Sequence, residues 1–175
     1  LVAENYLQDS NAIIFRLGTL FGIGDQFSRI RLDLVVNILT TKAFLENKMS
    51  VFGGDQWRPL LHVKDVANAI DNTIEGSVNG IFNLHHKNYK IIELAEKIKE
   101  KIPEVTIETT PLPFQDARNY QVSSAKLKTE TGFEASIELE RGINEVYDLI
   151  SSNRIKDIND PRYSNQSFLQ TFGIS

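Results

Sequence analysis

The stretch Trp57-Arg-Pro-Leu-Leu-His-Val-Lys-Asp-Val-Ala-Asn-Ala-Ile70 contains a strand pattern that leads directly into a helix pattern. Residues 58–62 are mostly apolar, as in a short strand. Pro59 has no N–H to donate, so it predicts that this strand lies at a sheet edge or starts irregularly. The apolar residues that follow recur at helical spacing, at positions 63, 66, 67, 70 and 74.

The same alternation continues on both sides of this stretch. Residues 1–8 have a helical pattern, and Ala12-Ile-Ile-Phe-Arg-Leu17 is an apolar run typical of a strand buried on both faces. Further strands are predicted at 49–52, 80–84 and 105–109, and further helices at 32–43, 91–102, 125–131 and 139–150. This alternation predicts an α/β fold, followed by a polar tail of little periodicity from residue 153.

Length and composition exclude several classes of protein. The 175 residues are enough for one sizeable core. A net charge of −4 gives no basic field that would attract nucleic acid, and the apolar runs fall far short of the roughly 20 residues that cross a bilayer. The chain has no cysteine, and its three histidines lack zinc-type spacing. We therefore expect no disulfide, no metal site and a cytoplasmic location.

The residues themselves offer few candidates for chemistry. The glycine loop Gly22-Ile-Gly24 lacks the third glycine of a dinucleotide fingerprint, and no tyrosine is followed by a lysine four residues later. Arg58, just ahead of a predicted helix, suits an oxyanion such as phosphate. It suits equally well a structural role, packed on Trp57 or paired with Asp65. Three histidines are expected to cap or pack at strand ends: His62, His85 and His86.

Several segments, taken in chain order, resemble the C-terminal half of the extended short-chain dehydrogenase/reductase family, the NAD-dependent nucleotide-sugar epimerases and dehydratases. They are Ala3-Glu4, Phe15-Arg-Leu-Gly-Thr-Leu-Phe-Gly-Ile-Gly-Asp25, Ser50-Val-Phe-Gly-Gly54, Trp57-Arg-Pro-Leu-Leu-His-Val-Lys-Asp65, Arg118-Asn-Tyr-Gln-Val-Ser-Ser-Ala-Lys126 and Thr131-Gly-Phe133. The resemblance implies the C-terminal remnant of a Rossmann-type parallel sheet plus a smaller mixed α/β substrate-binding lobe. It divides the chain into a Rossmann remnant at 1–25, a lobe with returning Rossmann-packing segments at 26–152 and a polar tail at 153–175.

The resemblance also implies a substrate site. Arg58 and Arg118 would bind the diphosphate of a nucleoside-diphosphate sugar, although Arg118 by itself has the pattern of an ordinary loop charge. Ser50 and Phe52 would border the base, with Phe52 packed on its ring. Thr19 would stand where many relatives have an asparagine that contacts the substrate.

Other residues are implied to lie near the cofactor or at the margin of the cleft. Leu17 and Gly18 would lie near the nicotinamide end of NAD. Arg29, Arg31 and Asp33 occupy the place where relatives line the sugar-nucleotide cleft. From charge alone, the two arginines are typical of a solvated helix N-terminus, where they are slightly unfavourable.

The family's Gly-rich phosphate loop, its Ser or Thr and its Tyr-x-x-x-Lys pair would all precede Leu1. We therefore expect a fragment that orients a nucleoside-diphosphate sugar for hydride transfer in a longer parent and has no catalytic residues of its own. It would bind NAD weakly or not at all. It would also self-associate through surfaces that a missing N-terminal Rossmann portion would cover. The alternative is a non-catalytic α/β module that binds a nucleotide or a protein partner.

Overall fold

The computed structural model of the chain describes residues 2–7, 9–25, 27–111 and 118–173. Its strands are β1 (Ile13–Leu17), β2 (Thr19–Phe21), β3 (Lys48–Phe52), β4 (Trp57–His62), β5 (Gly80–Leu84), β6 (Lys87–Lys90) and β7 (Thr106–Thr110). Its helices are α1 (Val2–Tyr6), α2 (Val35–Glu46), α3 (Val63–Thr73), α4 (Ile91–Lys101), α5 (Ala125–Thr131), α6 (Leu139–Ser151), α7 (Asn165–Phe172) and the 3₁₀ helix η1 (Pro161–Tyr163). Strands and helices alternate through most of the chain.

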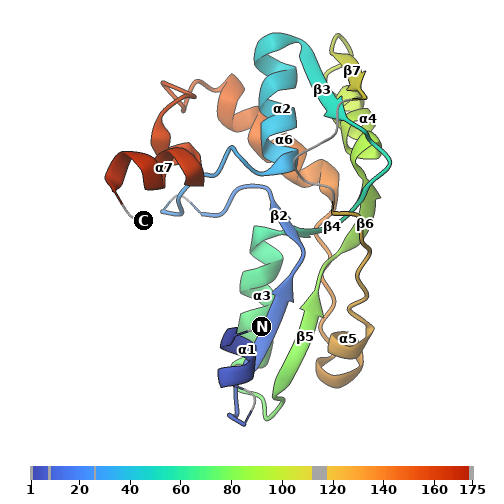
Figure 1. Ribbon diagram of the computed structural model, residues 1–175, viewed down its shortest axis with the longest axis vertical. Helices are drawn as coiled ribbons and strands as arrows, with labels where there is room; N and C mark the ends of the chain where they lie inside the picture. Colours follow the sequence, from blue (N-terminus) through green and yellow to red (C-terminus); the bar gives the residue numbers. More distant parts are fainter. Residues whose placement is uncertain (1, 8, 26, 112–117, 174–175) are drawn as a thin grey trace.

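Parallel pairing dominates the sheets, which confirms an α/β fold with parallel strands. β1 pairs with β5, from Ile13 opposite Gly80 to Leu17 opposite Leu84. β3 pairs with β7, and β2 pairs with β4, both in parallel, whereas β6 is antiparallel to β4. In Figure 1, β1 and β5 lie with α1, α3 and α5 toward one end of the long axis, and β3 and β7 lie with α2 and α4 toward the other.

The periodic segments appear close to their predicted positions, and the structure adds elements that lack periodicity. β2 has three residues between Gly18 and Gly22, and β6 is a polar strand that pairs with β4. The segment predicted as a polar tail contains η1 and α7, so the expectation of an irregular tail needs correction. Its order comes from local capping, since the Ser164 side chain accepts the N–H of Ser167 at 3.4 Å, and from contacts to distant residues described below.

Pro59 lies inside β4, the middle strand of its sheet, so the strand is not an edge strand, but its start is irregular as predicted, because Pro59 pairs with β6 alone. The register explains how the sheet accommodates the proline. β6 covers Trp57 to Leu60, whereas β2 begins only opposite Leu60. Because β2 does not reach Pro59, the missing N–H removes no hydrogen bond from the β2–β4 ladder.

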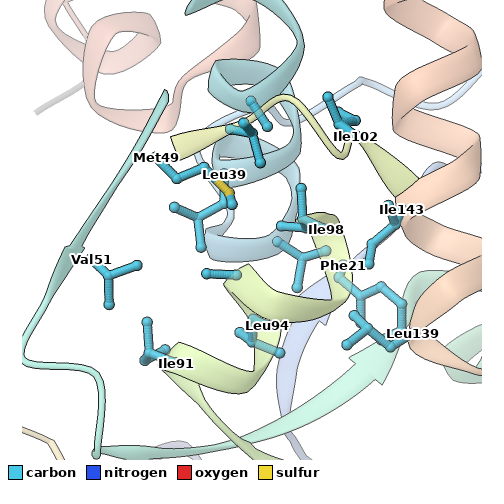
Figure 2. Packing of buried hydrophobic residues seen from close by; sticks show 14 of the residues in the cluster. Phe21, Leu39, Met49, Val51, Ile91, Leu94, Ile98, Ile102, Leu139 and Ile143 are labelled. Atoms are coloured by element: carbon cyan, nitrogen blue, oxygen red, sulfur yellow. The ribbon is translucent and has the colours of Figure 1, made fainter. Parts of the chain in front are cut away.

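The larger hydrophobic core is shared by α2, α4, α6 and β3. Figure 2 shows Leu39 of α2, Met49 of β3, Ile98 of α4 and Ile143 of α6 gathered in it together with Phe21 of β2. Full burial of such a side chain contributes about 1.5–3 kcal/mol. The apolar stripe that the sequence predicts for α2 faces this core, which confirms the helical spacing.

A smaller core lies between the β1–β5 sheet and the helices α3 and α5. Phe82 of β5 and Leu127 of α5 are fully buried in it. Leu61 of β4 belongs to this smaller core, whereas the preceding residue, Leu60, belongs to the larger one. Because side chains alternate across a strand, β4 supplies both cores from its two faces.

β4 ends at His62, which is fully buried and caps α3, as predicted for a histidine at a strand end. Its Nδ1 accepts the N–H of Lys64 at 3.2 Å, which assigns the ring proton to Nε2, 2.9 Å from an oxygen of Glu145. Glu145 also accepts Lys64 Nζ at 2.7 Å and the N–H of Ile23 at 3.1 Å. One carboxylate on α6 therefore connects α3, the end of β4 and the loop after β2.

Helix α6 approaches β2 most closely at Gly142. A Cβ at this position would lie 2.4 Å from Cδ2 of Phe21, which is too short for a real contact. The Phe21 ring is itself buried, and it packs edge-on against His62 with a centroid distance of 5.1 Å. The glycine is therefore required by the packing between α6 and β2.

We expect Gly142→Ala to destabilise the chain by about 1–3 kcal/mol, because the added methyl group overpacks a filled core. Alanine ordinarily stabilises a helix interior by about 1 kcal/mol relative to glycine, so the two effects have opposite signs. Urea unfolding measures the difference. Asn144→Ala, at an exposed position of the same helix, is the control and should be neutral or slightly stabilising. A stabilised Gly142→Ala protein would contradict the close packing.

The buried His62 makes stability depend on pH. Burial lowers the pKa of its imidazole below the ordinary value of 6.5, and Glu145 opposes this shift only in part. The unfolded chain therefore takes up a proton at a pH where the folded chain stays neutral. The stability that depends on neutral His62 is complete above about pH 6.5 and is lost as the pH falls through the folded pKa.

We expect the free energy of unfolding to fall between about pH 7 and about pH 5, and to fall less steeply in His62→Gln. Glutamine does not titrate, and its amide can still donate to Glu145. His85, whose pKa is also lowered by burial, contributes to the remaining slope. Denaturant unfolding at a series of pH values measures both slopes, and equal slopes in the two proteins would contradict this assignment.

Candidate functional site

A pocket of about 440 Å³ lies between α2, β3 and the start of β4, and we call it the α2–β3 pocket. Five residues for which the family resemblance implies substrate binding line it: Thr19, Ser50, Phe52, Arg58 and Arg118. They come from β2, β3, β4 and the segment that precedes α5. The fold thus brings together in one place residues that are widely separated in the sequence.

Arg58 and Arg118 are joined directly. Arg58 is the second residue of β4 and only 5% exposed. Its Nη1 donates to the carbonyl oxygen of Trp57 at 2.9 Å and to the carbonyl oxygen of Arg118. The N–H of Trp57 in turn donates to the Asn119 side chain at 3.0 Å. The start of β4 therefore holds the segment that carries Arg118, and both arginines line the α2–β3 pocket.

Asp65, considered from sequence as a partner for Arg58, has a different structural task. It is buried in the first turn of α3 and accepts the N–H groups of Ser136 and Ile137 at 3.2 and 2.9 Å. Its carboxylate therefore anchors the segment that leads into α6.

One face of α2 forms the opposite wall of the pocket. Val35, Ile38, Leu39 and Lys42 line it, at a spacing that places them on one side of the helix. Three of these residues are apolar, and Lys42 adds a cation near the C-terminal end of the helix. The sequence prediction missed Lys42, although its spacing from Val35 and Ile38 is a signal that could have found it.

Strand β3 supplies Ser50 and Phe52. Met49 and Val51 are buried in the larger core, so the alternating residues Ser50 and Phe52 face the other side of the strand. The ring of Phe52 is partly exposed at the pocket, where it offers an apolar surface to a planar group.

The structure does not bring Arg29 and Arg31 into the α2–β3 pocket. They precede α2 and lie near the C-terminal segment. Arg31 pairs with Asp33 through two contacts of 2.8 and 2.9 Å, and Arg29 donates to the Asn165 side chain. Asp33 does line the pocket and accepts the N–H of Asn165 at 2.9 Å. Burial raises the pKa of Asp33, but the hydrogen bonds from Arg31 and Asn165 outweigh this effect and lower it.

Leu17 and Gly18 lie at the end of β1, where close packing favours a glycine at position 18. The N–H of Gly18 donates to the Leu84 carbonyl at 2.8 Å, and a Cβ would lie 3.0 Å from the Pro59 carbonyl oxygen. A pyrophosphate cradle for NAD needs a Gly-rich turn between a strand and a helix. Among the described residues, β1 leads into β2 and β5 into β6, while β4 passes into α3 and β6 into α4 with no glycine at either junction. The described residues therefore do not fit the pyrophosphate of NAD.

The remaining histidines have structural partners. His85 follows β5, and its ring Nδ1 lies 2.6 Å from Oγ of Ser124, while His86 Nδ1 lies 2.8 Å from the Ala135 carbonyl oxygen. Ser124 is the N-cap residue of α5, but its side chain contacts His85 and makes no capping hydrogen bond. In the described part of the chain, His, Asp and Glu side chains form no group that could hold a metal ion, and no helix is long and apolar enough for a membrane span.

The fold is similar to solved enzymes that act on nucleotide sugars. An NAD-dependent NDP-hexosamine 5,6-dehydratase involved in tunicamycin biosynthesis matches with a TM-score of 0.73 and 18% identity, over 89% of this chain and 52% of that chain. UDP-glucose 4-epimerase from Thermotoga maritima, solved with UDP-glucose, matches with a TM-score of 0.71 and 20% identity, over 88% and 51%. UDP-glucuronic acid 4-epimerase from Bacillus cereus, in complex with UDP-glucuronic acid and NAD, matches with a TM-score of 0.69 and 19% identity, over 85% of this chain and 48% of that chain.

At these identities, the similarity to solved structures shows the shared fold alone. The chain spans about half the length of the proteins it matches. Residues 2–84 also match the family described as the NAD dependent epimerase/dehydratase family. This match covers β1 to β5 and therefore includes Thr19, Ser50, Phe52 and Arg58 of the α2–β3 pocket. The family match and the shared fold thus both point to the NAD-dependent epimerase/dehydratase family.

Proposed function

We propose that this chain is the substrate-binding, C-terminal half of an NAD-dependent nucleotide-sugar epimerase or dehydratase. It binds the nucleoside-diphosphate sugar in the α2–β3 pocket and orients it for hydride transfer in the intact enzyme. The observation that carries this proposal is the convergence of Thr19, Ser50, Phe52, Arg58 and Arg118 in a single pocket. Similar folds hold UDP-glucose in one relative and UDP-glucuronic acid in another.

The two arginines suit the diphosphate. A guanidinium keeps its charge at all ordinary pH values and presents a planar fork of donors that matches phosphate oxygens. Arg58 is fixed by burial in β4, and its bond to the Arg118 carbonyl fixes the second arginine close to it. Charge-assisted hydrogen bonds in such a partly enclosed site are stronger than in bulk water.

The remaining residues suit the base and the sugar. Phe52 provides a surface for stacking a base, with Ser50 as a polar neighbour on the same side of β3. Thr19 of β2 is the strand partner of Leu60 of β4, so it lies at the end of the pocket that β4 forms. For this reason we assign Thr19 to the sugar. The chain's part in the reaction is therefore positioning, which holds the sugar where chemistry in the other half can reach it.

We expect this chain to bind UDP, and Arg118→Ala to weaken that binding about tenfold, since a hydrogen bond to a charged group contributes about 1.5–3 kcal/mol. Arg118 is exposed, so its removal should leave the fold intact. Arg58→Ala should weaken binding at least as much. Because Arg58 is buried, thermal unfolding of the Arg58→Ala variant must be measured as well, to show that the variant is folded. Isothermal titration calorimetry gives the dissociation constants.

Arg162→Ala is the matched control, because Arg162 is an exposed arginine paired with Asp160 at 2.7 Å, away from the α2–β3 pocket. Its affinity for UDP should equal that of the unaltered chain. UDP affinity that is the same with and without Arg118 would count against the diphosphate site. If Arg118→Ala and Arg162→Ala lose the same UDP affinity, the contribution of Arg118 is only nonspecific attraction between charges.

We expect the chain to bind NAD weakly or not at all, because the described residues provide no cradle for its pyrophosphate. Calorimetry with NAD under the conditions used for UDP tests this. A micromolar dissociation constant for NAD would show that the chain holds a cofactor site and would overturn its assignment as the substrate-binding half. Self-association stays a prediction.

A further inference from the structure

Lys42 is a cation in the wall of the α2–β3 pocket that the proposed function leaves unassigned. It is half-buried, and its side chain makes no hydrogen bond or ion pair with any described residue. Other lysines around the two cores are paired, such as Lys48 with Glu108 at 2.7 Å and Lys64 with Glu145 at 2.7 Å. A lysine can bury its aliphatic stem while its ammonium group stays open to a partner in the pocket.

The acidic groups near Lys42 are already engaged or make no bond to it. Lys42 also borders a second cavity, between α2 and the C-terminal segment, where Asp33 and Asp160 are lining residues. Asp33 pairs with Arg31, and Asp160 pairs with Arg162. Glu46 follows one helical turn later, but its exposed side chain forms no ion pair with Lys42 among the described contacts. The Lys42 ammonium is thus available to a ligand in the α2–β3 pocket.

The hairpin formed by α2 and β3 gives Lys42 its place along the pocket. The chain reverses at Asn47, which has a left-handed backbone with φ of 50°, and β3 runs back beside α2 (Figure 1). Lys42 precedes Asn47 by five residues, roughly 8 Å along the helix, and Ser50 follows it by three, roughly 10 Å along the strand. Lys42 therefore lies level with Ser50, at the end of the pocket nearer the turn.

The arginines lie toward the other end. Val35 and Phe52 are each roughly 17–18 Å from Asn47 by the same count, and Arg58 follows further along the chain. A nucleotide with its diphosphate at the arginines and its base against Phe52 would direct the outer edge of the base toward Ser50 and Lys42. This step rests on the proposed function, because it uses the proposed position of the diphosphate.

We infer that Lys42 selects nucleotides whose base carries an exocyclic carbonyl oxygen at this outer edge. An ammonium group has three donors and no acceptor. Uracil, thymine and guanine present a carbonyl oxygen there, whereas cytosine and adenine present an amino group. The two kinds of base have nearly the same shape, so their opposite polarity decides the preference. An amino group facing Lys42 would place donor against donor and leave the lysine without a partner.

The test compares UDP with CDP, which differ at this edge of the base and share the ribose and diphosphate. We expect the chain to bind UDP about tenfold more tightly than CDP, as for one charge-assisted hydrogen bond made or lost. In Lys42→Met, which keeps the aliphatic length, the two affinities should become nearly equal. Lys48→Met is the control, because Lys48 lies on β3 outside the pocket lining, and it should keep the preference. Thermal unfolding checks that both variants fold.

The outcomes separate this inference from the function on which it rests. A UDP preference that survives in Lys42→Met overturns the inference. Equal weakening of UDP and CDP in that variant also overturns it, because the lysine would then contact a phosphate or the ribose. If both nucleotides bind with equal affinity and depend on Arg118, the proposed function stands and the Lys42 assignment fails. If neither nucleotide binds the unaltered chain, the proposed function fails and the inference fails with it.

Discussion

Strand β4 links both hydrophobic cores and the candidate site through contacts along its whole length. At its start, Arg58 donates to the Arg118 carbonyl, and this holds in place a segment 60 residues later in the chain. At its end, buried His62 donates to Glu145 and thereby connects α3, α6 and the loop after β2. Between these polar contacts, Leu60 and Leu61 enter the two hydrophobic cores from opposite faces. A displacement of this one strand would disturb both cores and the candidate site together.

The α2–β3 pocket derives its shape from the larger core. Its walls are α2 and β3, whose other faces carry Val36 and Met49 into close-packed surroundings. Protein interiors are packed as densely as organic crystals, so wall residues backed by such a core have little freedom to move. A pocket of this kind orients a ligand at small entropic cost, because the groups that contact it are held in position before it arrives. This property fits a chain whose proposed task is positioning.

Apolar periodicity made most of the fold predictable, and its absence explains the rest. The helices α2, α3, α4 and α6 repeat at helical spacing, and β1 and β5 are mostly apolar, so local sequence predicts them, although β1 is half-buried or exposed and not buried on both faces. In contrast, β6 is polar and exists because β4 offers it a partner, and Arg29 finds Asn165 136 residues away. Pro59 left open whether β4 is an edge strand or starts irregularly, because the register of β2, which local sequence does not specify, decides between the two. The pocket residues came from family resemblance, which reaches across such separations, but it did not indicate Lys42.

Arg58 makes the two ends of the proposed diphosphate site a single unit. Its guanidinium is part of the pocket wall, and the same group also holds the backbone of Arg118. Removing Arg58 would therefore take away one contact and also release the other arginine from its position. Effects that act through a shared contact are not additive, so the binding free energy cannot be divided between the two arginines. A buried cation is costly to place in a strand, and it is tolerated here because it receives carbonyl partners and supports the second cation. The burial of Arg58 is thus the physical reason that it can organise a binding site.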